Sequence, residues 1–129
     1  VQVLVNDSTL RTLIYSPDAA RATALLGNTP DAYDQTWHLP CDTNRLTTKQ
    51  FIALCSKIKG EELKYTIIKK WMIRMSGLFN PFIKEVVELI YQWEQDYIFD
   101  CSKFNTRFPN FKVTSLNDGI KEILSEYKQ

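Results

Sequence analysis

The segments of this chain that favour β structure are few and short, which limits the folds open to it. Alternating or β-branched patterns predict strands over residues 1–5, 10–15, 36–39 and 63–68. Strands as short as these do not form a stable sheet unless another part of a protein covers them. The pattern therefore predicts an α+β unit, a single domain over residues 1–129, that packs against something larger.

Helix start and stop signals separate the predicted strands. Together they predict about six helices, over residues 17–26, 47–59, 70–78, 81–94, 101–108 and from 116 onward. Thr47 and Gln50 have the spacing of a capping box, and Gly60 suits a left-handed helix end. Gly27 is interpreted as the same kind of stop for the first helix, whose alanines suggest close packing against a sheet.

Composition and charge argue against several classes of function. Hydrophobic residues make up 44% of the chain and charged residues 24%, as in an ordinary soluble globular domain. The formal net charge of +1 does not favour binding to nucleic acid or to an anionic membrane surface. The apolar runs are too short to span a bilayer, and the residues show no signal-peptide pattern.

The cysteines and the single histidine bear on redox state and metal binding. Cys41, Cys55 and Cys101 are far apart and form no Cys-x-x-Cys pair, which argues against a disulfide framework and against a zinc ribbon. A reduced, cytoplasmic compartment is the expected setting. Because His38 is the only histidine, a histidine-rich metal site is excluded, and we predict no metal-binding residues.

The four glycines are isolated and do not form a phosphate-binding loop. They stand at positions 27, 60, 77 and 119, most of them near predicted helix ends. A dinucleotide fingerprint needs clustered glycines between a strand and a helix, and a P-loop has the same need. We therefore expect no cofactor-binding residues in this chain.

One pair of residues imitates a catalytic motif. Tyr65 and Lys69 have the Tyr-x-x-x-Lys spacing of short-chain dehydrogenases, in which the lysine lowers the tyrosine pKa. That geometry needs a helix, where residues four apart share a face. The intervening Thr-Ile-Ile is β-branched and favours a strand, so the match is interpreted as coincidence and no catalytic residue is assigned.

His38 lies between Trp37 and Leu39 in a predicted strand and has two interpretations. Either it is a partly buried, hydrogen-bonded structural residue, or it lines a pocket and touches substrate. Asp18 and Asp100 are most simply explained as helix caps. Four further aromatic residues are interpreted as part of a core or of an interface between lobes: Trp71, Phe79, Phe82 and Trp93.

Several segments, taken in order, resemble the C-terminal part of one enzyme family. Arg11-Thr-Leu-Ile-Tyr-Ser-Pro-Asp18-Ala-Ala resembles a strand-to-helix stretch Arg-Asp-Tyr-Ile-His-Val-x-Asp-x-Ala. Trp37-His-Leu-Pro resembles a Tyr-Asn-Leu-Gly strand, and Asp100-Cys-Ser-Lys103 resembles an Asp-x-Ser-Lys motif. The family is the NAD-dependent epimerase/dehydratase family, the extended short-chain dehydrogenases, and the residues look like a bacterial branch of unassigned substrate.

The resemblance implies that this chain is one part of a larger enzyme. It would be the substrate-binding C-terminal lobe of an extended Rossmann-type short-chain dehydrogenase, and it begins at Val1 inside a predicted strand, as expected of a fragment. An N-terminal Rossmann domain, absent from this chain, would bind NAD or NADP and hold the catalytic Tyr-x-x-x-Lys pair. Hydride transfer by an epimerase, dehydratase or reductase would take place there.

The same resemblance supplies candidate residues for binding a small-molecule substrate, namely Arg11, Tyr15, Trp37 and His38. Arg11 stands where sugar-nucleotide epimerases place a phosphate-binding arginine, and its planar fork suits a diphosphate. A sugar or sugar nucleotide is one option for the substrate. Those members, however, carry an Arg-x-x-Asp that residues 91–96 lack, which argues against a sugar nucleotide.

Other functions and assemblies stay open. The parent protein is either an enzyme or a non-catalytic relative that senses the dinucleotide and regulates a partner. Whether the parent protein keeps the Tyr-x-x-x-Lys pair would decide between the enzyme and the sensor. A small self-sufficient interaction domain is favoured only if the isolated chain is a stable monomer without exposed apolar surface. A homodimer is also open.

Overall fold

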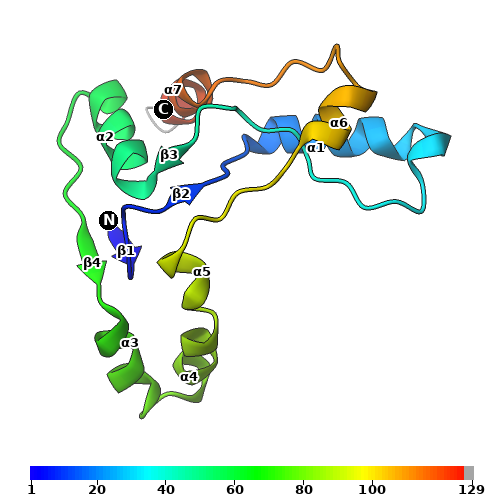
Figure 1. Cartoon of the computed structure of the whole chain (residues 1–129). Coiled ribbons are helices and arrows are strands. Elements are labelled where there is room, and N and C mark those ends of the chain that lie inside the picture. Colours follow the sequence, from blue (N-terminus) through cyan, green and yellow to red (C-terminus); the bar gives the residue numbers. More distant parts are fainter. Residues whose placement is uncertain (127–129) are drawn as a thin grey trace. The chain divides into compact units, whose positions relative to one another are not determined.

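The computed structural model describes residues 1–126, and these divide into two compact units (Figure 1). Unit 1 is formed by Val1–Arg11 and Leu46–Ile98. Unit 2 is formed by Thr12–Arg45 and by the described part of Phe99–Gln129. Helices predominate and the strands are short, so the predicted α+β class is confirmed.

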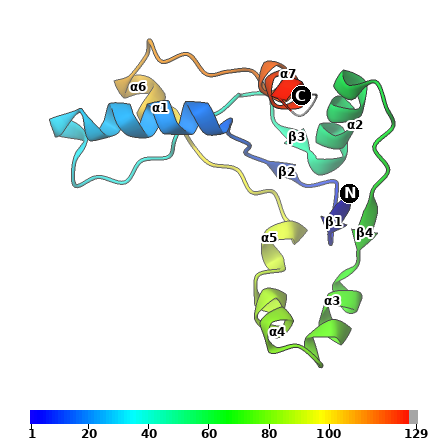
Figure 2. The same ribbon diagram turned by 180° about the vertical axis from the view of Figure 1, so that it is seen from behind.

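Unit 1 contains two small pairs of strands. Strand β1 (Gln2–Leu4) pairs with β4 (Thr66–Ile68) in parallel, and Figures 1 and 2 both show them side by side. Strand β2 (Leu10–Arg11) pairs with β3 (Leu46–Thr47) in antiparallel fashion. The strand predicted over residues 63–68 is thus present as β4, although it is shorter than predicted.

A turn follows the first strand, and the first and second strands do not pair with each other. Val5 directly follows β1 with a φ of 60°, a left-handed conformation that is rare for a β-branched residue. The Ser8 N–H then donates to Asn6 Oδ1 over 2.9 Å. The second strand ends at Arg11 instead of residue 15.

The capping signals around helix α2 (Thr48–Lys59) are confirmed. The Gln50 N–H donates to Thr47 Oγ1 over 3.2 Å, and the Thr47 N–H donates to Gln50 Oε1 over 2.9 Å. These two bonds satisfy donors that the first helical turn leaves without a partner. Gly60 ends the helix with a φ of 77°, a conformation that glycine adopts without strain.

The long helix predicted over residues 81–94 is divided in two. Helix α3 (Lys70–Gly77) is followed by α4 (Pro81–Glu88) and by the short α5 (Tyr91–Glu94). The N–H groups of Leu89 and Ile90 donate to carbonyls three residues earlier, at 3.0 and 3.3 Å, which tightens the chain between α4 and α5. The apolar periodicity continues through this tightened turn, so the pattern alone could not reveal the break.

Helices α3 and α4 lie side by side in both views (Figures 1 and 2). A Cβ atom on Gly77 would lie 3.3 Å from the Cα of Lys84. Glycine at this position therefore permits a close approach of the two backbones.

In its described residues, unit 2 contains helices and no strand. Its elements are α1 (Ser16–Gly27), the 3₁₀ helix η1 (Pro30–Ala32), α6 (Ser102–Arg107) and α7 (Leu116–Glu126). The strand predicted over residues 36–39 is wrong, because this extended segment pairs with no other strand within residues 1–126.

One expectation for α1 is wrong, and the packing of its alanines against a sheet stays a prediction. Gly27 has no left-handed φ, and the helix ends where the Asn28 backbone N–H and side-chain amide both donate to the carbonyl of Ala24. Ala22 is fully buried, but unit 2 offers no sheet among its described residues for the alanines to pack on. Short side chains thus indicated close packing without identifying the packing partner.

Unit 2 has an aromatic core around Phe104, which is completely buried. Its ring centroid lies 6.5 Å from that of Trp37, 4.9 Å from that of Phe108 and 5.3 Å from that of Phe111. These separations are typical of favourable aromatic pairs.

Asp18 joins α1 to the segment that precedes α7, so its predicted role as a helix cap is wrong. Its carboxylate is 1% exposed and accepts hydrogen bonds from the Thr114 N–H at 2.6 Å and the Thr114 hydroxyl at 2.9 Å. Arg21 completes an ion pair with the same carboxylate. Burial opposes ionisation, but the bonds from Arg21 and Thr114 outweigh it and hold the pKa of Asp18 below its usual value.

We expect Asp18→Asn to lower the free energy of unfolding by about 2–3 kcal/mol at neutral pH, because it replaces a charged acceptor of buried hydrogen bonds. A folded-state pKa below the unfolded value of 3.8 means that this stabilisation is present above pH 3.8 and is lost as the pH falls through the folded pKa. Urea denaturation followed by circular dichroism should therefore show the two proteins converging in acid.

Asp31→Asn is the matched control for this prediction. Asp31 pairs with Arg107 at 3.0 Å in an exposed position, where solvent screens the ion pair and leaves it little effect on stability. Equal losses of stability in the two variants would contradict the role given to Asp18.

No helix within residues 1–126 combines the length and the apolar character needed to cross a membrane.

Candidate functional site

A cavity in unit 2, here called the His38 cavity, brings together two of the four candidate residues. Its volume is about 250 Å³, and it is lined by Thr12, Ile14, Trp37, His38, Leu39 and Phe99. The Thr12 hydroxyl oxygen accepts hydrogen bonds from Arg45 at 2.5 Å and from the Phe99 N–H at 2.9 Å. These bonds hold the walls of the cavity near one another.

His38 is exposed, and one of its ring nitrogens has a partner. Nδ1 lies 2.9 Å from the carbonyl oxygen of Asp100, and because a carbonyl can only accept, Nδ1 carries the proton of that bond. The neutral ring then has Nε2 as an acceptor. The ring also meets Phe99 edge-on at 4.9 Å. His38 is therefore hydrogen-bonded, as the structural interpretation expects, and it lines a cavity, as the substrate interpretation expects.

Trp37 is fixed by its surroundings. Its Nε1–H donates to the carbonyl of Ala32 over 2.9 Å, and the Lys103 ammonium lies 4.2 Å from the ring centroid. Together with its contact to Phe104, these interactions make the indole a rigid wall of the cavity.

Tyr15 contacts α7 and does not line the His38 cavity. A Cβ atom on Gly119 would lie 3.1 Å from the tyrosine ring, so the glycine leaves room for it. Desolvation is the main cause that raises the pKa of Tyr15, and a hydrogen bond to the Glu122 carboxylate raises it further. The phenol therefore keeps its proton at neutral pH.

Arg11, the fourth candidate residue, belongs to unit 1. Its Nη2 donates to the carbonyl of Gln92 over 2.9 Å, and its guanidinium lies 5.8 Å from the Trp93 ring. Arg11 and Trp93 also line a cavity of about 400 Å³ in unit 1, beside Phe51 and Ile52. One edge of the guanidinium fork is thus occupied by the protein itself.

Tyr65 and Lys69 do not form a catalytic pair. The residues between them include strand β4, as predicted, and the Tyr65 hydroxyl donates to Asp7 Oδ2 over 2.6 Å. This bond to a carboxylate, together with burial, raises the pKa of Tyr65. A short-chain dehydrogenase tyrosine needs the opposite shift.

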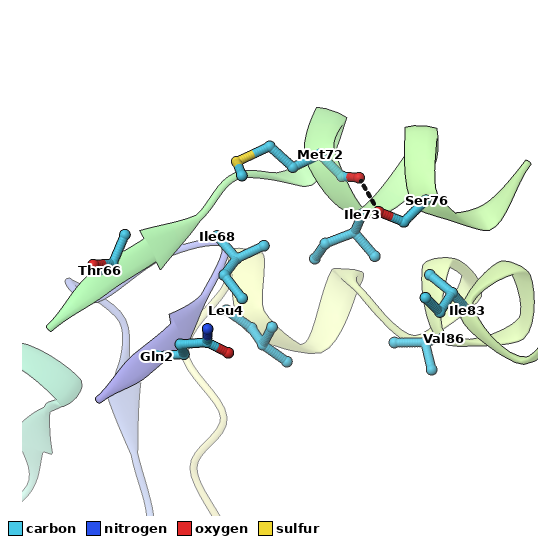
Figure 3. A pocket seen from close by; sticks show the side chains of 9 residues that line it. All are labelled: Gln2, Leu4, Thr66, Ile68, Met72, Ile73, Ser76, Ile83 and Val86. Carbon is cyan, nitrogen blue, oxygen red and sulfur yellow. Dashed lines mark hydrogen bonds between the residues drawn. The ribbon is translucent and has the colours of Figure 1, made fainter. Parts of the chain in front are cut away.

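A second cavity of unit 1 was not predicted from the sequence, and we call it the apolar groove (Figure 3). Its volume is about 410 Å³. Nine residues line it, from β1, β4, α3 and α4: Gln2, Leu4, Thr66, Ile68, Met72, Ile73, Ser76, Ile83 and Val86. The sequence feature that could have indicated the groove is the alternation in β1 and β4, where side chains two residues apart share a face. Which face lines the groove could not be predicted without knowing that these two strands pair.

Cys41 and Cys101 lie close together as free thiols next to the His38 cavity. Both are buried, their sulfur atoms are 3.4 Å apart, and Cys101 Sγ donates to the carbonyl of Leu39 over 3.1 Å. Burial and the neighbouring Cys101 thiol raise the pKa of Cys41 to about 11. Burial also raises the pKa of Cys55.

Alkylation of Cys41 should therefore be slow at neutral pH and accelerate about tenfold for each added pH unit below its pKa, because the thiolate is the nucleophile. The rate can be measured with a pulse of iodoacetamide, proteolysis and mass spectrometry. The chain unfolded in urea is the control, and its cysteines should react as ordinary thiols. Rapid labelling of native Cys41 at neutral pH would contradict its buried, protonated state.

Within residues 1–126, no three side chains of His, Cys, Asp or Glu come together in an arrangement that could hold a metal ion.

Two solved structures resemble this chain. Isoflavone reductase matches it with a TM-score of 0.65 and 19% identity, covering 95% of this chain and 43% of its own length. Triphenylmethane reductase from Citrobacter sp. matches with a TM-score of 0.60 and 15% identity, covering 96% of this chain and 44% of its own. No family model matches the sequence, and no curated protein does.

The comparisons define the fold and leave the narrower family as a prediction. Nearly all of this chain has the fold of a part of two reductases, and it spans less than half the length of either structure. At such low identities the likeness concerns the fold alone. The resemblance to epimerases and dehydratases still rests on the sequence motifs.

Proposed function

We propose that this chain is the substrate-binding part of an NAD(P)-dependent reductase of the extended short-chain dehydrogenase type. The observation that carries this proposal is the match of almost the whole chain to less than half of each of two reductases. The remainder of such a protein would form the Rossmann domain, and bound NAD or NADP would supply hydride transfer. The proposal keeps the epimerase/dehydratase family as the sequence relationship.

In this proposal the chain binds and orients the substrate and keeps water away from it. Trp37 forms a rigid wall of the His38 cavity, and His38 Nε2 offers an acceptor to a substrate hydroxyl. Arg11 and Tyr15 have the weaker claim, because their polar groups interact with Gln92 and Glu122.

Exposed aromatic residues in unit 1 favour this proposal over a self-sufficient interaction domain. Trp71 is 63% exposed, Phe79 is 87% exposed and Phe82 is 72% exposed. These side chains are therefore not core residues, and the interpretation as an interface between lobes fits them better. A domain that functions alone would be expected to cover such side chains.

We expect the isolated chain to bind neither NADH nor NADPH, whereas the natural protein that contains it binds one of them. Dinucleotide binding by each of the two proteins can be measured by titration, with the nicotinamide fluorescence as the signal. Tight dinucleotide binding by the isolated chain would contradict the division of functions. Absence of binding by the natural protein would contradict the reductase itself.

Reduction can be tested with an isoflavone and a triphenylmethane dye, the compounds named in the two similar structures. In the natural protein, His38→Ala should raise KM about tenfold with a smaller change in kcat, since it removes a binding contact and no reacting group. Gln35→Ala is the control, because Gln35 is exposed and bonds to the nearby carbonyl of Asp31. A loss of kcat alone in His38→Ala would point to a role in the chemical step.

A further inference from the structure

The apolar groove has a single chemical character along its whole length. The register of β1 and β4 places Gln2 opposite Thr66 and Leu4 opposite Ile68, so these four side chains share one face of the pair. Figure 3 shows this face meeting side chains of α3 and α4 across the cavity. Aliphatic side chains and one methionine therefore surround most of the space.

None of the nine lining residues can carry a charge. The polar members are Gln2, Thr66 and Ser76, and the Ser76 hydroxyl already donates to the carbonyl of Met72 over 3.0 Å. An ionic group placed here would lose its hydration and find no opposite charge, which is strongly unfavourable. An uncharged ligand with few polar atoms avoids that penalty.

Arg11, the phosphate-binding candidate from the sequence, does not change this conclusion. Arg11 lies outside the lining of the apolar groove, and its guanidinium binds the carbonyl of Gln92 and stacks near Trp93. A diphosphate in the groove would have no arginine of the lining to pair with.

The groove also has a shape suited to a small molecule. Its volume of about 410 Å³ falls within the range of about 300–1,000 Å³ that is usual for ligand pockets. The most exposed aromatic side chains of α3, α4 and the turn between them, Trp71, Phe79 and Phe82, are not part of its lining. The surface available for packing against another part of the protein is thus distinct from the concave groove.

We propose that the apolar groove of unit 1 binds an uncharged, largely hydrocarbon small molecule, at a site that shares no lining residue with the His38 cavity of unit 2. The inference goes beyond the proposed function, because it adds a binding site that the proposed function does not use. Ligand binding in the apolar groove can be tested without any catalytic reaction.

The test compares two probes that share the naphthalene ring, the neutral 2-naphthol and the anionic naphthalene-2-sulfonate. Each is titrated into the chain and followed by calorimetry. We expect the neutral naphthol to bind at least about tenfold more tightly, because the groove offers no partner for the sulfonate. Equal affinities, tighter binding of the sulfonate or no binding of the naphthol would each overturn the proposal.

Two neighbouring valines of α4 provide matched variants. Val86 lines the apolar groove and Val87 does not, and both are half-buried in the same helix. Val86→Asp should weaken naphthol binding about tenfold or more, and Val87→Asp should leave it unchanged. If Val86→Asp fails to fold, Thr66→Glu replaces it, because Thr66 is exposed at the rim and tolerates a charge. An unchanged affinity in the folded groove variant would overturn the assignment.

The same titration on the natural protein separates the remaining outcomes. If the isolated chain binds naphthol and the natural protein does not, another segment of the protein fills the groove and the ligand proposal is wrong. If both bind naphthol but the natural protein binds no dinucleotide, the groove assignment stands and the reductase proposal fails.

Discussion

The parallel pairing of β1 with β4 is the constraint on which unit 1 depends. Three residues from each strand bring Gln2–Leu4 beside a segment more than sixty residues later in the sequence. Parallel pairs need a long connection, and here β2, β3 and α2 lie within it. The pairing also sets which side chains of the two strands face the apolar groove. Asp18 has the comparable role in unit 2, where it joins α1 to the segment before α7.

Local signals could be predicted from the sequence wherever neighbouring residues decide the conformation. The capping box at Thr47 and the left-handed Gly60 depend only on residues within one turn, and both are present. Gly27 is the last residue of α1 but is not a left-handed stop, because the next residue, Asn28, binds the carbonyl of Ala24 and caps the helix end. The strand predicted at residues 36–39 failed because a β ladder needs a partner strand, and none pairs with it within residues 1–126.

The candidate site was predictable only in part for the same reason. Trp37 and His38 are adjacent in sequence, so a motif that singles out one of them also includes the other. Both line the same cavity. The apolar groove needs residues from four elements, and its existence follows from a strand register that no local pattern encodes. Arg11 was chosen for its guanidinium, but a sequence gives no sign that a backbone carbonyl and an indole ring occupy that group.

The bond between Asp18 and Thr114 has a consequence for how the chain is made. Its two residues are 96 positions apart, and the whole of Leu46–Ile98 is synthesised between them. Unit 2 cannot close during translation until the ribosome has released the segment beyond Thr114, long after it has released α1. Closing so long a loop is entropically costly and slows folding. Phe104, Phe108 and Phe111 therefore reach their positions only after the whole of Leu46–Ile98 has been synthesised, and until then the aromatic core of unit 2 cannot form.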